Sequence, residues 1–265
     1  MTLLIIRSTM SISTKREYKG VLSIKLIAII ASLYGIILNW KGLFSLTYFT
    51  NLSNIFMVCV LMWALVKHIK HPRNKATYTS LPHSDNTNAL WYTVKFMATL
   101  SIMVTFSLYV FFLAPTNEQG FIAAFTHNYC ASLCVHVIAP LFALADFLLF
   151  DNPSKSNKYT VWCGVIPPFA YIAYVYILSF WFHVTWKHGM PAPYNFLNYA
   201  APSGWFGLEW GAISSTSLGI GVVYFITIFT ILFLCLGKLG MIWQNKLYKK
   251  RITRFAADTE DQAHR

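Results

Sequence analysis

The sequence predicts an all-α, polytopic membrane protein with six transmembrane helices and both termini in the cytoplasm. Hydrophobic residues make up 56% of the chain and charged residues only 11%, whereas roughly a quarter of a soluble domain is charged. The mean hydropathy is +0.51. The apolar residues form continuous runs rather than alternating ones, which argues against transmembrane β-strands.

Six apolar runs are long enough to cross about 30 Å of hydrocarbon, which takes roughly 20 helical residues. We expect helices at Val21–Leu38, Phe49–Val66, Val94–Leu113, Thr126–Phe150, Val161–Phe182 and Leu218–Trp243. Residues 1–20 lack the apolar core and cleavage site of a signal peptide and are expected to form a cytoplasmic lead. Residues 21–245 then form the six-helix domain, and residues 246–265 a basic, then disordered, cytoplasmic tail.

Lysine and arginine set the expected orientation. Most of them lie in the lead, in the connection Lys67–Tyr92, at Lys155 and Lys158, and in the tail, whereas the opposite side holds only Lys41 and Lys187. Because basic loops stay on the cytoplasmic side, both termini are expected there. The net charge of +12 follows from this topology, and we expect no nucleic-acid partner.

A few ionisable residues lie inside the expected spans. Lys25, Lys95 and Lys238 lie near the cytoplasmic ends of their helices, where long side chains can snorkel toward water. Asp146 is the one acid inside a span, and we expect it to anchor the inner end of the fourth helix. The sequence therefore favours structural roles for these charges.

The cysteines and loop histidines do not have the spacing of a metal site. Without paired C-x-x-C spacing, the cysteines are expected to be packed free thiols rather than disulfides. They are Cys59, Cys130, Cys134, Cys163 and Cys235. The first inner loop carries His68, His71 and His83, whose pattern favours a solvated loop over zinc.

The head of the second run, Leu46–Phe56, is unusually polar. On a helix, Thr47, Asn51 and Asn54 recur on one stripe, and Thr50 joins Asn54 four residues away. Unpaired amides and hydroxyls are costly in hydrocarbon, so this stripe should face protein or a watery cavity. Hydrogen bonding between helices is the structural alternative.

The fourth run carries a second polar stripe. Asn128, Ser132 and His136 are spaced by four residues, and Pro140 follows four residues later. Because proline lacks an N–H, the carbonyl of His136 loses its helical donor and the helix is expected to kink there. An ionisable side chain in mid-span indicates function, with a neutral imidazole bonded to a neighbouring helix as the structural alternative.

The two stripes together predict a reactive pair. A Thr50 hydroxyl bonded to a neutral His136 imidazole is a minimal nucleophile and base. Asp146 is about 15 Å beyond His136 along a helix and cannot orient the base. An amide, a hydroxyl, a backbone carbonyl or Glu209 would have to do so.

Three short motifs carry a family resemblance: YFTNLSN at Tyr48–Asn54, VHVIAP at Val135–Pro140 and PYNFLN at Pro193–Asn198. With these motifs the chain resembles the androgen-induced gene family of six-span membrane proteins, and especially its bacterial branch. The resemblance implies a hydrolase of fatty acid esters of hydroxy fatty acids, with Thr50 as nucleophile and His136 as the histidine. It also implies a bacterial plasma membrane.

Two features qualify this expectation. Thr47 is the alternative nucleophile, and the residues after Thr50 follow the bacterial branch rather than the animal one, which leaves the substrate open. Polar neighbours are candidates for binding the substrate or the oxyanion: Asn51, Asn54, Ser132 and Asn128. We expect a lipid ester substrate, membrane lipids as neighbours, no cofactor and no metal.

Two other functions remain open. The same polar stripes would also line the pocket of a non-enzymatic protein that binds lipids or small molecules. A proton-coupled transporter ranks last because Asp146 is the one acid within a span. The long connection His183–Ser217 is rich in proline, glycine and aromatic residues, which indicates either a structured lid or an aromatic belt at the outer interface.

Overall fold

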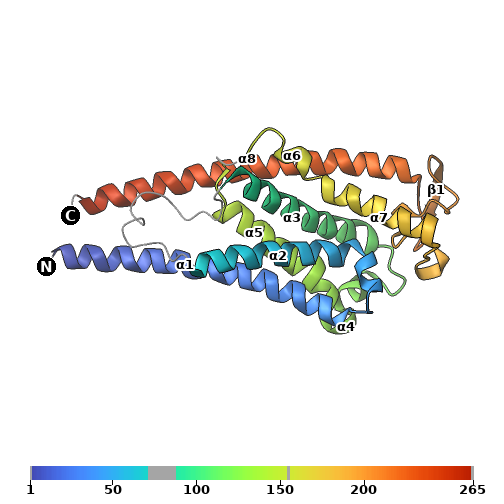
Figure 1. Cartoon of the computed structure of the whole chain (residues 1–265), viewed down its shortest axis with the longest axis horizontal. Helices are drawn as coiled ribbons and strands as arrows, with labels where there is room; N and C mark the ends of the chain where they lie inside the picture. The colour runs from blue at the N-terminus through green and yellow to red at the C-terminus, as the bar shows by residue number, and fades with distance from the viewer. Residues whose placement is uncertain (1, 71–87, 154–155, 264–265) are drawn as a thin grey trace.

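The computed structural model describes residues 2–70, 88–153 and 156–263. Within them, six helices are long and apolar enough to cross a membrane, which confirms the predicted helical architecture with six candidate spans. Figure 1 shows the long helices side by side, with both termini at one end and the β1 strand at the other. The end of the bundle that holds the termini is called the terminal end, and the end that holds β1 is called the lid end.

The elements follow the expected runs closely. The α-helices are α1 Thr2–Leu38, α2 Phe49–Lys70, α3 Ala89–Leu108, α4 Phe121–Leu133, α5 Ala139–Phe150, α6 Thr160–Cys163, α7 Ile166–Phe182 and α8 Val222–Ala263. Two π-helical turns are η3 Tyr109–Leu113 and η4 Cys134–Ile138, and three 3₁₀ turns are η1 Phe44–Thr47, η6 Lys187–Gly189 and η7 Asn195–Leu197. The strands are β1 Leu208–Ile213 and β2 Leu218–Ile220.

Some boundaries differ from the expected ones for local reasons. The third span starts at Ala89 because the Asn88 side chain caps α3, accepting a bond from the Trp91 N–H at 2.8 Å. The fifth is interrupted after Cys163, and two prolines follow at the start of α7. Helix α1 extends back into the expected lead and α8 forward through the expected tail to Ala263.

The fourth span is the most irregular. It consists of α4, η4 and α5, and three successive residues in α4 have positive φ: Asn128, Tyr129 and Cys130. Left-handed backbone is costly for residues other than glycine. The stripe expected through Asn128, Ser132 and His136 is therefore not a continuous helical face.

Four helices form the centre of the bundle. Helix α1 packs against α2 and α5, and α3 packs against the same two helices. Gly35 of α1 allows a close approach to the fourth span, because a Cβ there would lie 2.4 Å from Val135 Cγ1 and 2.7 Å from the Ala131 carbonyl oxygen. Small residues of this kind let membrane helices pack closely. The contact holds the turn that carries His136 against α1.

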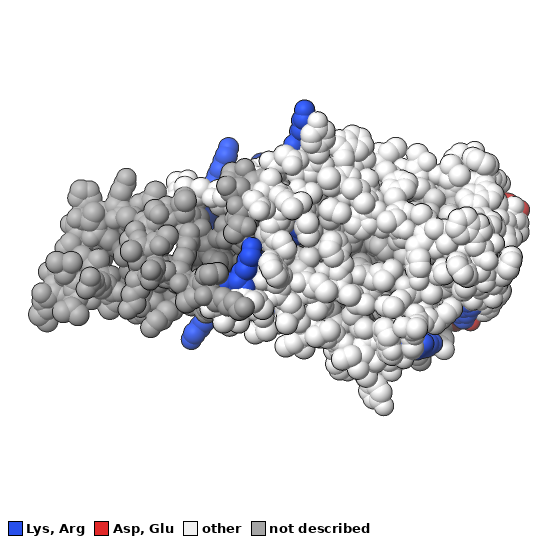
Figure 2. All heavy atoms as spheres, in the orientation of Figure 1, with Lys and Arg blue, Asp and Glu red and all other residues white. Residues whose placement is uncertain are grey.

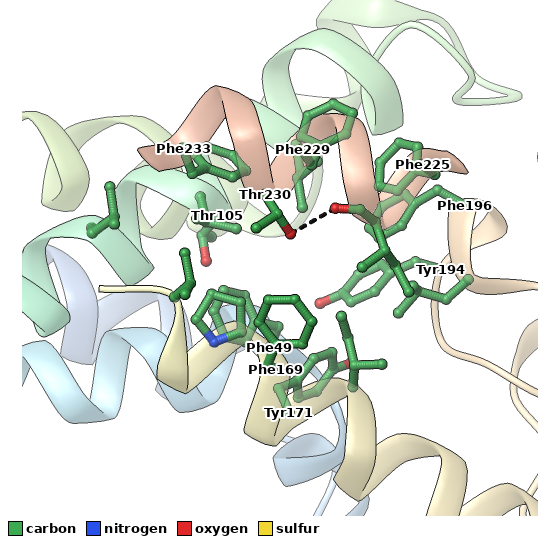
Figure 3. A pocket seen from close by; sticks show the side chains of 18 of the residues that line it. Phe49, Thr105, Phe169, Tyr171, Tyr194, Phe196, Phe225, Phe229, Thr230 and Phe233 are labelled. Carbon is green, nitrogen blue, oxygen red and sulfur yellow. Dashed lines mark hydrogen bonds between the residues drawn. The ribbon is translucent and has the colours of Figure 1, made fainter. Parts of the chain in front are cut away.

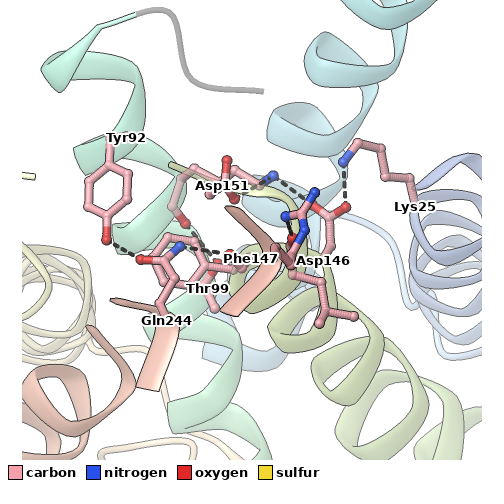
Figure 4. A network of polar contacts seen from close by, with 10 residues as sticks. Lys25, Tyr92, Thr99, Asp146, Phe147, Asp151 and Gln244 are labelled. Carbon is pink, nitrogen blue, oxygen red and sulfur yellow. Dashed lines mark hydrogen bonds and ion pairs between the residues drawn. The ribbon is translucent and has the colours of Figure 1, made fainter. Parts of the chain in front are cut away.

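Buried charges join the helices toward the terminal end. Lys25 donates to Asp146, and the Lys95 ammonium lies 2.6 Å from Asp146 Oδ2 and 2.7 Å from Asp151 Oδ2. All four side chains are essentially inaccessible, and Figure 4 shows Lys25, Asp146 and Asp151 close together between the helices. The expectation that Lys25 and Lys95 snorkel to water is therefore wrong, because Asp146 pairs with both.

The charges on the surface have a different distribution. On the face drawn in Figure 2, Lys and Arg side chains project near the terminal end, and a broad uncharged belt separates them from a few charges at the lid end. The five cysteines are free, as expected, but Cys59 and Cys235 are exposed rather than packed. His71 and His83 lie outside the described residues.

The connection between α7 and α8 forms an ordered cover. Strands β1 and β2 pair antiparallel, so the predicted all-α class needs one correction, and Leu218 belongs to a strand rather than to the last helix. Tyr199 stacks on Trp205 with ring centroids 5.1 Å apart, and Phe196 stacks on Phe225 at 4.6 Å. Aromatic packing of this kind joins the connection to the helices beneath it.

Candidate active site

Thr50 lies in the first turn of α2, directly after the extended residue Tyr48. The first N–H groups of a helix have no carbonyl partner within the helix, and they give that end a partial positive charge. The Thr50 N–H instead donates to the hydroxyl oxygen of Tyr194, at 3.4 Å. The Thr50 hydroxyl therefore lies at an electropositive helix end.

His136 lies in the π-helical turn η4. Its Nδ1 is 2.8 Å from the backbone oxygen of Ser132. Since a carbonyl oxygen only accepts, Nδ1 carries the proton and Nε2 is the acceptor. Thr50 Oγ1 lies 3.2 Å from Nε2, so its hydroxyl donates to the imidazole. This is the geometry of a nucleophile and a general base, with the base oriented by a backbone carbonyl.

A tyrosine packs flat on the imidazole. The Tyr109 ring stacks on His136 with centroids 3.5 Å apart and 13° between the planes. Tyr109 begins the other π turn, η3, and its hydroxyl donates to the Ala124 carbonyl. π-Helical turns are rare and often occur at functional sites. Each of the two π turns in the described chain supplies one of the stacked rings.

An apolar cavity adjoins this pair. It encloses about 780 Å³, counting the space at its open side. Thr50 and Tyr109 are part of its wall. Figure 3 shows the Tyr194 hydroxyl directed into the cavity, opposite phenylalanines of α8. The remaining wall comes mainly from aliphatic and aromatic side chains of α3, α7, η7 and α8, with Gly164 and Val165 between α6 and α7.

Asn54 braces the pair. Its Nδ2 donates to the Thr50 carbonyl at 2.8 Å and to the Val135 carbonyl at 3.2 Å, and its Oδ1 accepts from the Ser32 hydroxyl at 2.9 Å. Both amide hydrogens are thus used in joining α2 to the turn beside His136. In this geometry Asn54 positions the site and offers no free donor to an oxyanion.

Asn51 and Thr47 hold the segment before α2. Asn51 Nδ2 donates to the Ser45 carbonyl at 2.7 Å. The Thr47 hydroxyl donates to the Phe44 carbonyl at 2.7 Å and accepts from Trp186 Nε1 at 2.9 Å. Thr47 belongs to η1 rather than to α2, so the expected helical stripe begins only at the helix start. Of the two threonines considered, Thr50 is the one that contacts His136.

The other two polar candidates, Asn128 and Ser132, have structural roles that differ from each other. The Asn128 amide donates to the Leu38 carbonyl at 2.7 Å and to Asn39 Oδ1 at 3.0 Å, which fixes the lid end of α1. Ser132 contributes its carbonyl, the group that orients His136. Glu209, considered as an orienter, lies in β1, and the carbonyl takes that position on the imidazole.

Sequence reasoning missed Tyr109 and Tyr194. Tyr194 lies in the motif Pro193–Asn198, so the resemblance drew attention to its neighbourhood but gave it no role. Tyr109 is one aromatic residue within an apolar run, and no local signal distinguishes it. Its importance depends on a contact with a residue 27 positions later.

Comparison of the chain with family models, curated proteins and solved structures finds no match. The family resemblance of the three motifs therefore stays a prediction. Around the cavity, a hydroxyl, an oriented neutral imidazole and a tyrosine hydroxyl meet at one end of an apolar chamber.

Proposed function

We propose that this protein is an intramembrane lipid ester hydrolase that uses Thr50 as nucleophile and His136 as general base. The observation that carries the proposal is the bond between Thr50 Oγ1 and the unprotonated Nε2 of His136, 3.2 Å apart, at the edge of an apolar cavity. A hydroxyl needs an adjacent base to become a nucleophile, and an apolar cavity suits the chain of a lipid.

The reaction proceeds by acyl transfer. His136 Nε2 takes the proton as Thr50 Oγ1 attacks the ester carbonyl, and the resulting imidazolium then protonates the departing alcohol. The Ser132 carbonyl, which accepts from Nδ1, stabilises the imidazolium. Water, activated by the same nitrogen, then attacks the acyl-threonine ester and releases the fatty acid. These steps require no cofactor.

The candidate donor to the oxyanion is the hydroxyl of Tyr194. Its oxygen accepts from the Thr50 N–H at 3.4 Å, which places this hydroxyl beside the nucleophile. Burial raises the pKa of Tyr194 above its usual value, so the phenol keeps its proton at neutral pH and can donate. Preorganised donors aimed at developing charge lower the barrier to acyl transfer. This role replaces the one considered for Asn51 and Asn54.

Fatty acid esters of hydroxy fatty acids, implied by the motif resemblance, are the first substrates to test. The basic residues gathered near the terminal end favour cytoplasmic termini, in a bacterial plasma membrane. This orientation is tested by placing single cysteines at the two ends of the bundle and labelling intact cells with a thiol reagent that does not cross the membrane. Cysteines at the terminal end should stay unlabelled.

The decisive experiment uses variants of the purified protein. Thr50→Ala should abolish both ester hydrolysis and covalent labelling by a fluorophosphonate probe. His136→Ala should lower the hydrolysis rate by about 10²–10⁴-fold, the usual contribution of a general base. Thr227→Ala is the matched control, because this threonine is exposed on α8 and bonds its own helix. Wild-type turnover in folded Thr50→Ala protein would overturn the proposal.

The alternative is a protein that binds lipids without reacting with them. The size and apolar wall of the cavity favour it as much as they favour a hydrolase. The two functions differ in labelling: a binding protein would hold lipid equally well with or without the Thr50 hydroxyl and would not react with the fluorophosphonate. The oriented imidazole favours the hydrolase, since binding an apolar chain requires no base.

A further inference from the structure

The polarity of the residues that line the cavity beside Thr50 changes along its length. Its lid end is lined by Thr50, Tyr109 and Tyr194, and the Tyr194 hydroxyl is directed into it (Figure 3). Farther in, the hydroxyls are already bonded to protein: Thr105 to Ser53, with the two oxygens 2.7 Å apart, and Thr230 to its own helix. None of the described residues that line it is charged. The inner part is therefore suited to hydrocarbon and not to a charged head group.

The depth of the cavity can be estimated from two helices. On α3 it extends from Tyr109, beside His136, to Leu100, which spans about 13 Å at the helical rise per residue. On α8 it extends from Phe225 to Phe233, or about 12 Å. Half of the hydrocarbon thickness of a bilayer is about 15 Å, the depth of one leaflet of acyl chains. The chamber is thus about as deep as one long acyl chain.

The inner end of the chamber is closed. A Cβ on Gly164 would lie 2.6 Å from Leu100 Cδ2 and 2.8 Å from Phe96 Cε1, and one on Gly237 would lie 3.0 Å from Phe96 Cζ. Gly164, directly after α6, and Gly237 of α8 let these segments pack directly on the Phe96 and Leu100 side chains of α3. A chain entering from the lid end therefore meets a floor at this level.

We propose that this chamber holds the acyl half of the ester and that its floor sets the longest acyl chain accepted. This inference rests on the proposed function and names its substrate class: esters of one long, uncharged acyl chain. The chain points inward, its carbonyl carbon lies at Thr50, and the bond to the alcohol breaks as the bond to Thr50 Oγ1 forms. The alcohol, protonated by His136, leaves toward the lid.

Two cavity variants test the proposal. Val104 lines the chamber one helical turn closer to Tyr109 than Leu100 does, and it is 3% exposed. The change Val104→Phe should therefore shorten the chamber. We expect kcat/KM for p-nitrophenyl palmitate to fall about tenfold or more, because its far methylenes lose their apolar contacts in the shortened chamber. The value of kcat/KM for the butyrate ester should change less than about twofold, because the short chain does not reach that level. Phe233→Ala should instead deepen the chamber and shift the preferred acyl chain toward longer acids.

Val66→Phe is the matched control, because Val66 is 39% exposed on α2 and does not line the chamber. If both cavity variants keep the wild-type chain-length profile while hydrolysis still requires Thr50, the chamber proposal is overturned and the proposed function stands. If Thr50→Ala hydrolyses normally but the profile shifts as expected, the nucleophile is wrong and the chamber stands.

Binding provides a readout that does not depend on catalysis. In Thr50→Ala protein, palmitate should displace a fluorescent long-chain fatty acid far better than butyrate does. The Val104→Phe change in that background should reduce the advantage of palmitate by about tenfold. Equal displacement by both acids, or an advantage that Val104→Phe leaves intact, would overturn the chamber even if the protein hydrolyses none of the esters tested.

Discussion

Backbone atoms set the alignment of Thr50 and His136 as much as side chains do. The Ser132 carbonyl fixes the tautomer of the imidazole, and the Thr50 carbonyl and N–H bond Asn54 and Tyr194. A carbonyl orients a base without carrying a full negative charge into the membrane, which would be costly to desolvate. The arrangement thus provides an oriented base without an acid beside it.

Removing one hydroxyl tests the oxyanion role of Tyr194. Tyr194→Phe keeps the ring, which stacks on Phe196 with centroids 5.1 Å apart, but loses the donor. We expect kcat to fall by about 10²–10³-fold, the usual effect of losing one oxyanion donor, with little change in KM. Steady-state kinetics with a soluble ester measures both.

A second tyrosine of the same connection is the control. The hydroxyl of Tyr199 lies 2.9 Å from the Ser179 hydroxyl, away from the cavity wall. Tyr199→Phe should therefore leave kcat within about threefold of wild type. An equal loss in both variants would mean that the hydroxyls stabilise the connection and that Tyr194 has no special part in the reaction.

The elements that make the site are two π-helical turns, η3 and η4. A π turn adds one residue to a helix, so the side chains on either side are rotated by about 100° from their α-helical register. Pro140 favours η4 because it has no N–H to bond the carbonyl of His136, four residues earlier. The expected kink is thus realised as a widened turn that carries the imidazole.

Restoring the missing donor should separate stability from activity. Pro140→Ala supplies an N–H that can bond the His136 carbonyl, which favours ordinary α-helix over the π turn. The melting temperature should stay equal or rise, because proline is unfavourable inside a helix. Activity should nonetheless fall about tenfold or more as the imidazole moves from Thr50. Thermal unfolding and ester turnover of the same preparation check both.

Pro167→Ala is the comparison for this change. Pro167 lies in the first turn of α7, where an N–H has no helical partner and proline is tolerated. It should leave activity unchanged. Full activity in Pro140→Ala protein would show that η4 does not depend on the proline.

The molecule has two polar regions, which lie at different positions along the bundle. The Thr50–His136 pair and the cavity form one region, and the buried cluster around Asp146 forms the other (Figure 4). The Tyr92 hydroxyl and the Phe147 carbonyl both bond Gln244 of α8, at 2.6 and 2.8 Å. Buried charges and amides thereby join α1, α3, α5 and α8 without contributing to the site.

Asp146→Asn tests this structural role. It leaves two buried lysines with one carboxylate fewer, and breaking a buried ion pair typically costs about 3–5 kcal/mol. We expect a marked loss of thermal stability in detergent, while the protein that remains folded keeps its turnover per molecule. Unfolding followed by intrinsic fluorescence, together with labelling by the fluorophosphonate, measures both quantities.

Glu118 provides the control for the loss of a carboxylate. It lies 3.5 Å from the Lys187 ammonium and 3.2 Å from His188 Nε2, and all three side chains are partly or largely exposed. Exposed ion pairs contribute little to stability, so Glu118→Gln should leave the melting temperature nearly unchanged. A similar loss in both variants would argue against a special role for the buried cluster.

The sequence by itself determined the six spans, because crossing hydrocarbon requires about 20 apolar residues and this signal is local. It also singled out Thr50 and His136, because polar groups within apolar runs are conspicuous. It misjudged the environment of Lys25 and Lys95 and the strand at Leu218, since the partners of each lie far along the chain.

Only the tertiary structure decided which hydrogen-bond partner each polar group has. Asn54 and Asn51 looked like oxyanion donors until their amides were found bonded to carbonyls of other segments. Tyr109 and Tyr194 had no local signal, because their contacts with His136 and Thr50 form only where separate helices and the connection between α7 and α8 meet. Hydropathy and spacing act along one helix, whereas hydrogen-bond partners, ring stacking and cavity depth depend on how the helices pack.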